Sequence, residues 1–388
     1  MNHKKKSRIA PVVSRRNVVA SLALLPLVHA CALPGPSTSA RHYTPSGMPL
    51  RRVNVSEGRI IRTVTGLRPF RSSGFVVRAE KLDGKTVVHN YGHGGGGITL
   101  SWGTSHLALE LARQTGQRRC AVVGCGAVGL ASAILMQRDG WDVTIYARDL
   151  PPETTSNIAG AQWSPASVFD RDSVSDAFYA QLRSAMEHSY RYFQDMVGDR
   201  YGVRWISNYM LADRPFAADD LFARHSDMYP EFRTLTRQEH PFPAPHARHF
   251  DTMFIEPPVY LAALMRDYYA AGGRIIVRSF EDRADLMSLD EPVLINCTGL
   301  GARELFGDDD LIPVKGQLLV LMPQADLNYL MIYQGIYMFP RNDGVLLGGT
   351  FERDTWSISP NESENARILQ GHRAFFREME DPWSSSPA

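Results

Sequence analysis

Residues 119–149 constrain the fold more than any other part of the sequence. They begin with a short apolar run at 120–123, which leads into a turn with glycines in the spacing G-x-G-x-x-G, namely Gly124, Gly126 and Gly129. Small and aliphatic residues at 127–136 predict a buried helix, and 141–147 predict a second strand. Strand, glycine turn, helix and strand in this order predict the βαβ unit of a dinucleotide-binding fold. The pyrophosphate would lie at the helix N-terminus, where unpaired N–H groups favour an anion.

The identity of the nucleotide stays open on this motif alone. A carboxylate for the ribose hydroxyls is expected at the end of the second strand, where Ala147 stands. Asp149 offers such a carboxylate two residues later, whereas Arg148 could bind a phosphate as in NADP-binding proteins. FAD, NAD and NADP are therefore all compatible with the turn.

Composition narrows the class of protein. The 388 residues are enough for two domains, and 42 Lys and Arg against 41 Asp and Glu leave almost no net charge. Because no basic block is present, we expect no nucleic-acid partner. The four cysteines form no spaced pairs and no zinc-like cluster, which predicts buried free thiols and no metal site.

Residues 1–31 have the features of an export signal. The arginine pair Arg15 and Arg16 precedes an apolar stretch at 18–28 that is too short to span a bilayer comfortably. This pattern predicts the twin-arginine export machinery, which carries folded proteins, and a periplasmic or secreted product. Cleavage could follow Ala30, although Cys31 also allows lipid attachment and a membrane tether. Residues 32–50 then predict a flexible tether.

Four consecutive glycines at 94–97 separate a predicted strand from a helix-forming run at 104–114. Each glycine costs conformational entropy and adds no apolar side chain, so packing alone is a poor reason for four of them. We expect the backbone here to lie directly against a flat ligand.

The surrounding line, HNYGHGGGGITLSWG at 89–103, resembles the flavin-contacting signature of the D-amino-acid oxidase family, which includes the D-aspartate oxidases. Further segments resemble other parts of that family: GLRPFR at 66–71, VVGCGAVGLASA at 122–133, YARDLPPETTSNIAGAQWSP at 146–165, LINCTGLGA at 294–302 and YMFPRNDGVLLGGTF at 337–351. Typical members carry the GLRP and HNYGHGG segments last, whereas here they precede the glycine turn. The sequence therefore resembles a circularly permuted member.

The resemblance implies an α/β fold with a Rossmann-like FAD-binding domain and a second domain built on a mixed or antiparallel sheet. The FAD-binding domain would comprise 86–165 and 255–304, and the substrate domain 51–85, 166–254 and 305–388. The FAD-binding residues that the resemblance implies are Gly94, Gly95, Gly96, Gly97, Ile98, Thr99, Gly124, Gly126, Val128, Gly129, Arg148, Asp149, Thr154, Thr155, Ser156, Gly160, Ala161 and Gln162.

It also implies a substrate site. Arg68 would hold the substrate carboxylate through two parallel hydrogen bonds, and the Tyr337 hydroxyl would donate to the same group. Tyr333 stands where the family has an active-site lid tyrosine, and the carbonyl of Gly95 would accept from the substrate amine. His89 and His93 are expected to order the glycine line by hydrogen bonds.

The function implied is oxidative deamination of D-amino acids by hydride transfer from Cα to flavin N5. It would yield 2-oxo acids and ammonia, with hydrogen peroxide formed from oxygen. Alternatives are a dehydrogenase with another electron acceptor, a D-aspartate oxidase with Arg341 as a second cation, and a catalytically silent flavin-binding envelope protein. An NADP reductase would require the HNYGHGG resemblance to be accidental.

Outside these segments the pattern predicts helices at 178–197, 260–271 and 364–380. Strands are expected at 58–64, 75–77, 274–277, 293–297, 315–322 and 345–350. Residues 241–258, with five prolines, predict a loop.

Overall fold

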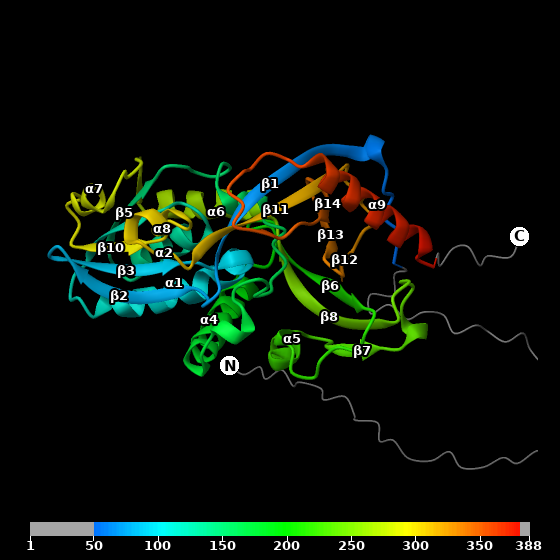
Figure 1. Ribbon diagram of the computed structural model, residues 1–388. Helices are drawn as coiled ribbons and strands as arrows, with labels where there is room; N and C mark the ends of the chain where they lie inside the picture. The colour runs from blue at the N-terminus through cyan, green and yellow to red at the C-terminus, as the bar shows by residue number, and fades with distance from the viewer. Residues whose placement is uncertain (1–49, 381–388) are drawn as a thin grey trace, which may run out of the picture. The chain divides into compact units, whose positions relative to one another are not determined.

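The computed structural model describes residues 50–380. The predicted export signal with Cys31, the tether up to residue 49 and the C-terminal tail lie outside these residues. Within them, no helix is long and apolar enough to cross a membrane. Two sheets organise this part of the chain, and each carries its own set of helices (Figure 1).

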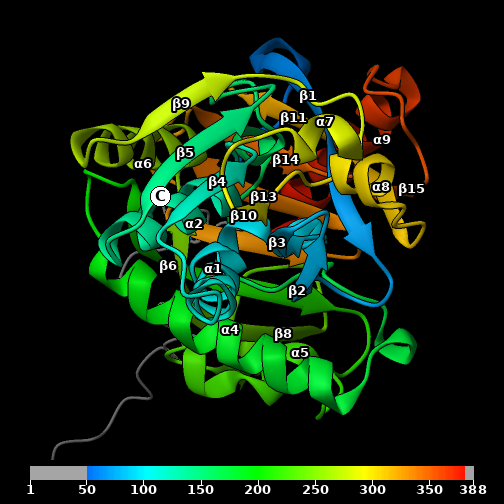
Figure 2. The same ribbon diagram turned by 90° about the vertical axis from the view of Figure 1, so that its left-hand side faces the viewer.

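The glycine turn belongs to a six-stranded sheet with the order β2-β3-β10-β4-β5-β9. All neighbours after the antiparallel β2–β3 pair are parallel. Figure 2 shows β9, β5, β4, β10 and β3 in sequence across the sheet. The strands are β2 (Val76–Leu82), β3 (Lys85–Tyr91), β4 (Arg119–Val123), β5 (Asp142–Ala147), β9 (Arg274–Val277) and β10 (Val293–Asn296).

Apolar side chains alternate between the two faces of this sheet. One face packs against α1 (Gly97–Arg113), α2 (Ala127–Arg138) and α6 (Pro257–Ala270), and α4 (Asp176–Asp195) packs on α1. On the other face, the apolar cluster includes side chains of α7 (Arg283–Met287) and α8 (Gly301–Phe306). Helices on both faces explain why the strands read as continuous apolar runs.

The second sheet has nine strands in the order β1-β11-β14-β13-β12-β6-β8-β7, with β15 paired to β11. Its longest pairing joins β1 to β11, which are antiparallel from end to end and lie side by side in Figure 1. The strands are β1 (Ile60–Arg71), β6 (Val203–Ala212), β7 (Arg233–Leu235), β8 (His246–Ile255), β11 (Leu311–Leu321), β12 (Tyr329–Tyr333), β13 (Ile336–Arg341), β14 (Gly344–Gly348) and β15 (Glu352–Arg353).

One face of the nine-stranded sheet is covered by α9 (Glu362–Glu378), whose Ile368 and Phe375 join an apolar cluster with Leu319 and Met338. The opposite face carries a smaller cluster that contains Leu318, Phe339 and Tyr337. The remaining helical turns are α3 (Thr155–Ile158), α5 (Leu221–Arg224), η1 (Glu57–Arg59), η2 (Gly94–Gly96), η3 (Arg171–Ser173), η4 (Ser226–Met228) and η5 (Arg237–Glu239).

Two sequence predictions need correction. Residues 241–258 are not a loop throughout, because 246–255 form β8, which pairs along its whole length with β6, and only 241–245 and 256 lack regular structure. The prolines flank this strand, at 241, 243, 245, 257 and 258, and none lies within it. The proposed domain boundary at residue 85 is also misplaced, because it separates β2 from β3, which pair in one sheet.

Candidate active site

Strand β1 carries Arg68 from the nine-stranded sheet toward the six-stranded one. Phe70 forms an isolated bridge with His93, and a Cβ added to Gly299 would lie 4.0 Å from Pro69. His93 and Gly299 follow β3 and β10, which are adjacent parallel strands. Arg68 is therefore close to the carboxyl edge of the six-stranded sheet, where open α/β sheets bind ligands.

The Arg68 guanidinium is half-buried, and among residues 50–380 no carboxylate forms an ion pair with it. Its Nη1 donates to the carbonyl of Thr350 at 3.3 Å, and the guanidinium carbon lies 5.9 Å from the centre of the Phe351 ring. A partly desolvated cation without an internal counter-charge favours binding of an anion from outside.

Tyr337 lies on the same face of the sheet as Arg68. The residues directly opposite one another are Tyr337, Gly348, Leu318 and Val64, and Arg68 is four residues beyond Val64 on β1, which keeps it on that face. Burial raises the pKa of Tyr337, and the Arg68 guanidinium beside its hydroxyl opposes part of that rise. The phenol therefore stays protonated at neutral pH and can donate a hydrogen bond.

Glycines form the surface under both side chains, and the sequence prediction missed them. A Cβ on Gly316 would lie 2.5 Å from Arg68 Nη2, and one on Gly348 would lie 2.0 Å from Tyr337 Cζ. A Cβ on Gly349 would lie 2.8 Å from the Tyr337 hydroxyl. Isolated glycines within strand patterns signal close approach of another group, and this signal was available in the sequence.

The structure places Tyr333 away from this site, which corrects its prediction as a lid residue. Tyr333 pairs with Ile336 across the β12–β13 hairpin, so its side chain is on the face opposite that of Tyr337. Its hydroxyl donates to Asp213 Oδ1 at 2.6 Å, which raises the pKa of Tyr333 to about 12, and its ring packs on Phe375 of α9. Spacing in the sequence could not reveal this, because a two-residue hairpin turn separates the two tyrosines.

Arg341, considered above as a second cation, is committed elsewhere. Its side chain is only 4% exposed, and its Nε and Nη2 donate to the two oxygens of Asp343 at 2.8 and 2.7 Å. It therefore neither faces solvent nor offers an open charge to a substrate.

The glycine line owes much of its composition to packing, contrary to the sequence prediction. Added Cβ atoms would lie 2.0 Å from the Ser167 carbonyl at Gly94, 2.7 Å from the Ala166 carbonyl at Gly95 and 2.6 Å from Val168 at Gly96. Only Gly97, the first residue of α1, has open space, with His93 Cβ at 3.9 Å. Contact of this line with flavin stays a prediction, as does the role of the Gly95 carbonyl. The N–H of Gly95 donates to the Ser167 carbonyl at 3.0 Å, and Gly95 is exposed.

His89 and His93 order the line through hydrogen bonds, as predicted. The ring nitrogens of His89 pair with Glu80 Oε1 at 2.9 Å and with Asn296 Nδ2 at 3.0 Å, and His93 Nε2 lies 3.0 Å from Thr104 Oγ1. Burial lowers the pKa of His93 to about 3.

Among residues 50–380, no group of three or more His, Cys, Asp or Glu side chains could hold a metal ion.

The buried His93 predicts an acid-sensitive stability. Its pKa is near 3 in the folded chain, against 6.5 for an ordinary histidine, so the unfolded chain binds more protons between these values. Stability therefore falls as pH drops from about 6.5. One such group contributes a slope of at most about 1.4 kcal/mol per pH unit. Urea unfolding at pH 7, 6 and 5 should show a smaller slope for His93→Gln than for the wild type. Equal slopes would contradict this origin.

The glycine turn has two kinds of glycine. Gly124 and Gly129 pack internally, because added Cβ atoms would lie 2.4 Å from the Cys297 carbonyl and 2.0 Å from the Gly124 carbonyl. Gly126 is the N-cap of α2, and its Cβ would meet only the Ser156 hydroxyl, at 3.0 Å. That hydroxyl accepts from the N–H of Ala127 at 3.1 Å. The N-terminus of α2 is thus covered by one small polar group.

The loop at 160–162, which follows α3, lies on the part of the chain that connects the two sheets. A Cβ on Gly160 would lie 2.7 Å from the Phe339 ring and 3.9 Å from Tyr337. The carbonyl of Ala161 accepts from Ile255, and Gln162 Nε2 donates to Asn208 Oδ1 at 3.0 Å. Residues predicted for the flavin and for the substrate therefore meet at this loop.

Comparison with known proteins decides the family. The family described as FAD dependent oxidoreductase matches residues 119–386, more than half of the chain. The chain belongs to this family of FAD-dependent oxidoreductases.

Relatives within the family are amino-acid oxidases. The chain is 32% identical to a D-amino-acid oxidase of Streptomyces coelicolor over 256 residues, 64% of this chain and 75% of that one. It is 30% identical to the D-aspartate oxidase of Homo sapiens over 263 residues, 65% of this chain and 74% of that one. A D-amino-acid oxidase of Rubrobacter xylanophilus is 29% identical over 262 residues, 65% and 75% of the two chains.

Solved structures agree on the fold. Glycine oxidase from Geobacillus kaustophilus has a TM-score of 0.52 at 20% identity, over 68% of this chain and 80% of that one. Glycine oxidase from Bacillus cereus has a TM-score of 0.51 at 15% identity, over the same shares. The α/β class with a Rossmann-like FAD-binding fold and a second mixed sheet is therefore confirmed.

FAD is the cofactor of this family, and the residues present suit it. Gly126 leaves the N-terminus of α2 without a side chain that would exclude a pyrophosphate, and Gly97 does the same for α1. Ala147 ends β5, and the next residue, Arg148, is 77% exposed and pairs with Asp149 at 2.8 Å. The remaining residues predicted to hold FAD lie in the first turn of α2, around α3 and at the start of α1: Val128, Thr154, Thr155, Ser156, Ile98 and Thr99.

Filling the space at Gly126 should weaken FAD binding. Gly126→Val places branched methyl groups where only the Ser156 hydroxyl now lies, so we expect a roughly three- to tenfold higher Kd for FAD, about 0.7–1.4 kcal/mol. Flavin fluorescence during titration of the apoprotein measures it. Gly58→Val is the matched control, because nothing lies within 4 Å of that Cβ. An unchanged Kd in Gly126→Val would place the pyrophosphate elsewhere.

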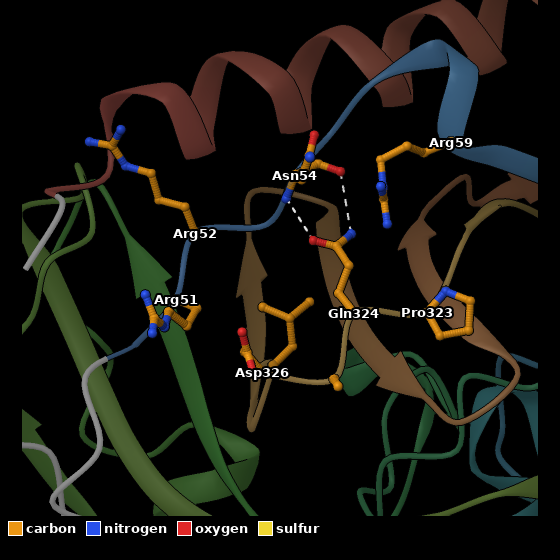
Figure 3. Close-up of a pocket in the computed structure, with 9 residues that line it drawn as sticks. Arg51, Arg52, Asn54, Arg59, Pro323, Gln324 and Asp326 are labelled. Atoms are coloured by element: carbon orange, nitrogen blue, oxygen red, sulfur yellow. Dashed lines mark hydrogen bonds between the residues drawn. The ribbon is translucent and has the colours of Figure 1, made fainter. Parts of the chain in front are cut away.

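A separate cavity of about 270 Å³ lies away from these residues. It is lined by the segment before β1 and the loop after β11, including Arg51, Arg59 and Asp326 (Figure 3). Arg52 points from it toward the end of α9, where its guanidinium donates to the Met379 carbonyl. Asn54 and Gln324 hydrogen-bond to each other across it at 2.8 and 3.3 Å. None of the predicted site residues lines this cavity.

Proposed function

We propose that this FAD-dependent oxidoreductase oxidatively deaminates D-amino acids. The observation that carries the proposal is the Arg68 guanidinium, which has no carboxylate partner among residues 50–380 and lies beside the Tyr337 hydroxyl. A cation and a phenol donor on one sheet face suit a carboxylate better than any neutral group. The relatives named D-amino-acid oxidase and D-aspartate oxidase support a D-amino acid as substrate.

In this proposal, the chain acts mainly by positioning. Arg68 donates hydrogen bonds from two N–H groups to the substrate carboxylate, and the Tyr337 hydroxyl donates a third to the same carboxylate. The carbonyl of Gly95 accepts a hydrogen bond from the substrate amine, which must be neutral for oxidation to begin. FAD, when bound, supplies the acceptor for the hydride from Cα. No side chain is required to act as an acid or a base at Cα, so orientation accounts for most of the rate.

The products identify the reaction. With oxygen as acceptor, one D-amino acid, one O₂ and one water yield one 2-oxo acid, one ammonia and one hydrogen peroxide. Oxygen uptake with separate panels of D- and L-amino acids, together with assays for all three products, tests the proposal. Equal amounts of the three products from D-substrates alone are expected. Turnover that needs an added dye and consumes no oxygen would indicate a dehydrogenase, and activity on L-amino acids would overturn the assigned chirality.

We also propose that the chain is a circularly permuted member that is exported through the twin-arginine route. The family match begins at β4, while β1 and β3 precede it in the chain and yet pair with β11 and β10. The export part of this proposal rests on the sequence of residues 1–31. To test export, the mature chain is sought in the periplasm or medium. After replacement of Arg15 and Arg16 by lysine, the chain should instead stay in the cytoplasm.

A further inference from the structure

Phe351, three residues after the end of β14, has guanidinium groups of two arginines close to its ring. The guanidinium carbon of Arg68 lies 5.9 Å from the ring centre, and that of Arg353 lies 5.6 Å from it. Phe351 is 45% exposed and meets Phe70 edge to face at 6.1 Å. A second cation thus lies on the same aromatic side chain as the proposed carboxylate-binding arginine.

The two arginines differ in their partners. Arg353 donates from Nη1 and Nη2 to the two oxygens of Asp170, at 2.8 and 2.6 Å, and its guanidinium also lies 4.7 Å from the Phe70 ring. These hydrogen bonds lower the pKa of Asp170, so the carboxylate is charged at neutral pH. Arg68 has no such partner among residues 50–380. The charge of Arg353 is therefore neutralised, while that of Arg68 is open.

We propose that Asp170 is a specificity-determining residue that keeps Arg353 from binding the side-chain carboxylate of an acidic substrate. This inference rests on the proposed function. An acidic side chain that approached Arg353 would have to replace two charge-assisted hydrogen bonds and would meet the negative charge of Asp170. A neutral side chain meets the Phe351 ring without that cost. The other arginine considered for this role, Arg341, is held by Asp343 in the same way.

The test is to remove the charge of Asp170 and keep its size. In Asp170→Asn the guanidinium of Arg353 becomes available, and kcat/KM for D-aspartate should rise at least about tenfold, while that for D-leucine stays within about threefold of wild type. Asp170→Ser, which also removes the charge, gives a second variant should the first fold poorly. In the double variant Asp170→Asn, Arg353→Met, kcat/KM for D-aspartate should return to the wild-type value.

Asp219→Asn is the matched control. Asp219 also pairs with arginines, Arg171 at 2.5 Å and Arg224 at 3.3 Å, but neither contacts Phe351. It should leave both kcat/KM values unchanged.

Three results would count against the inference. A wild type that prefers D-aspartate to D-leucine overturns it and leaves the proposed function intact. An unchanged ratio of kcat/KM for D-aspartate to kcat/KM for D-leucine in both Asp170 variants, folded and loaded with FAD, also overturns the inference and leaves the proposed function intact. A wild type that oxidises no D-amino acid overturns the proposed function together with the inference.

Discussion

Arg68→Ala should leave FAD bound but lower kcat/KM for D-amino acids by roughly 30- to 5,000-fold. The variant leaves the substrate carboxylate without its cation in a partly desolvated site, and truncation of one partner of such a pair costs about 2–5 kcal/mol. Because Arg68 on β1 shares a face of the nine-stranded sheet with Tyr337 on β13 and is not in the glycine turn, the visible flavin spectrum should not change. Steady-state kinetics and the flavin absorbance of the purified variant measure both effects.

Arg62→Ala provides the matched control for this prediction. Arg62 is on the same strand but is exposed and pairs with Asp343 at 2.5 Å. Its removal should change kcat/KM by less than about twofold, since an exposed ion pair contributes about 0–1 kcal/mol to stability and nothing to the substrate site. Equal losses in the two variants, or full turnover in Arg68→Ala, would remove Arg68 from the site.

Gly348→Ala should displace the Tyr337 ring. The new methyl group would lie 2.0 Å from Tyr337 Cζ, which is inside van der Waals contact, so the ring must leave its position across from Gly348. The displaced hydroxyl can then no longer donate to the substrate carboxylate. Because a hydrogen bond to a charged group contributes about 1.5–3 kcal/mol, we expect kcat/KM to fall roughly 10- to 150-fold with FAD content retained. Kinetics with a D-amino acid and flavin absorbance again measure the outcome.

Gly371→Ala, on α9, is the matched control for Gly348→Ala. The nearest atom to its Cβ is a methyl carbon of Ile336 at 3.8 Å, an ordinary contact. It should leave kcat/KM unchanged. If Gly348→Ala turns over as the wild type does, the ring of Tyr337 has no role in holding the substrate.

Local pattern was sufficient for much of the fold. The apolar runs at 120–123 and 293–297 became the buried strands β4 and β10, and the helix predicted at 178–197 is α4, with differences of two residues at its ends. The predictions of these elements are correct because each element buries an apolar face, and the spacing of apolar residues in the sequence shows that face. The prediction for 246–255, which form β8, was wrong because it gave too much weight to the prolines on either side. None of these prolines interrupts the hydrogen bonds between β8 and β6.

The candidate site was predicted less completely, because long-range pairing determines it. Tyr333 and Tyr337 are four residues apart, yet the β12–β13 turn places them on opposite faces of the sheet. The packing of Gly94, Gly95 and Gly96 against residues 165–168 joins segments about 70 residues apart, which no local pattern indicates. Likewise, the salt bridge between Arg353 and Asp170 spans 183 residues.

The most direct test of the account is an anaerobic titration of the purified FAD-bound chain with D-alanine and, separately, L-alanine. Flavin absorbance near 450 nm should bleach with the D-enantiomer alone and return when air is admitted, with hydrogen peroxide formed. A yellow protein that neither enantiomer, nor any member of a wider D-amino-acid panel, can bleach would contradict the assignment of Arg68 and Tyr337 to an amino-acid substrate.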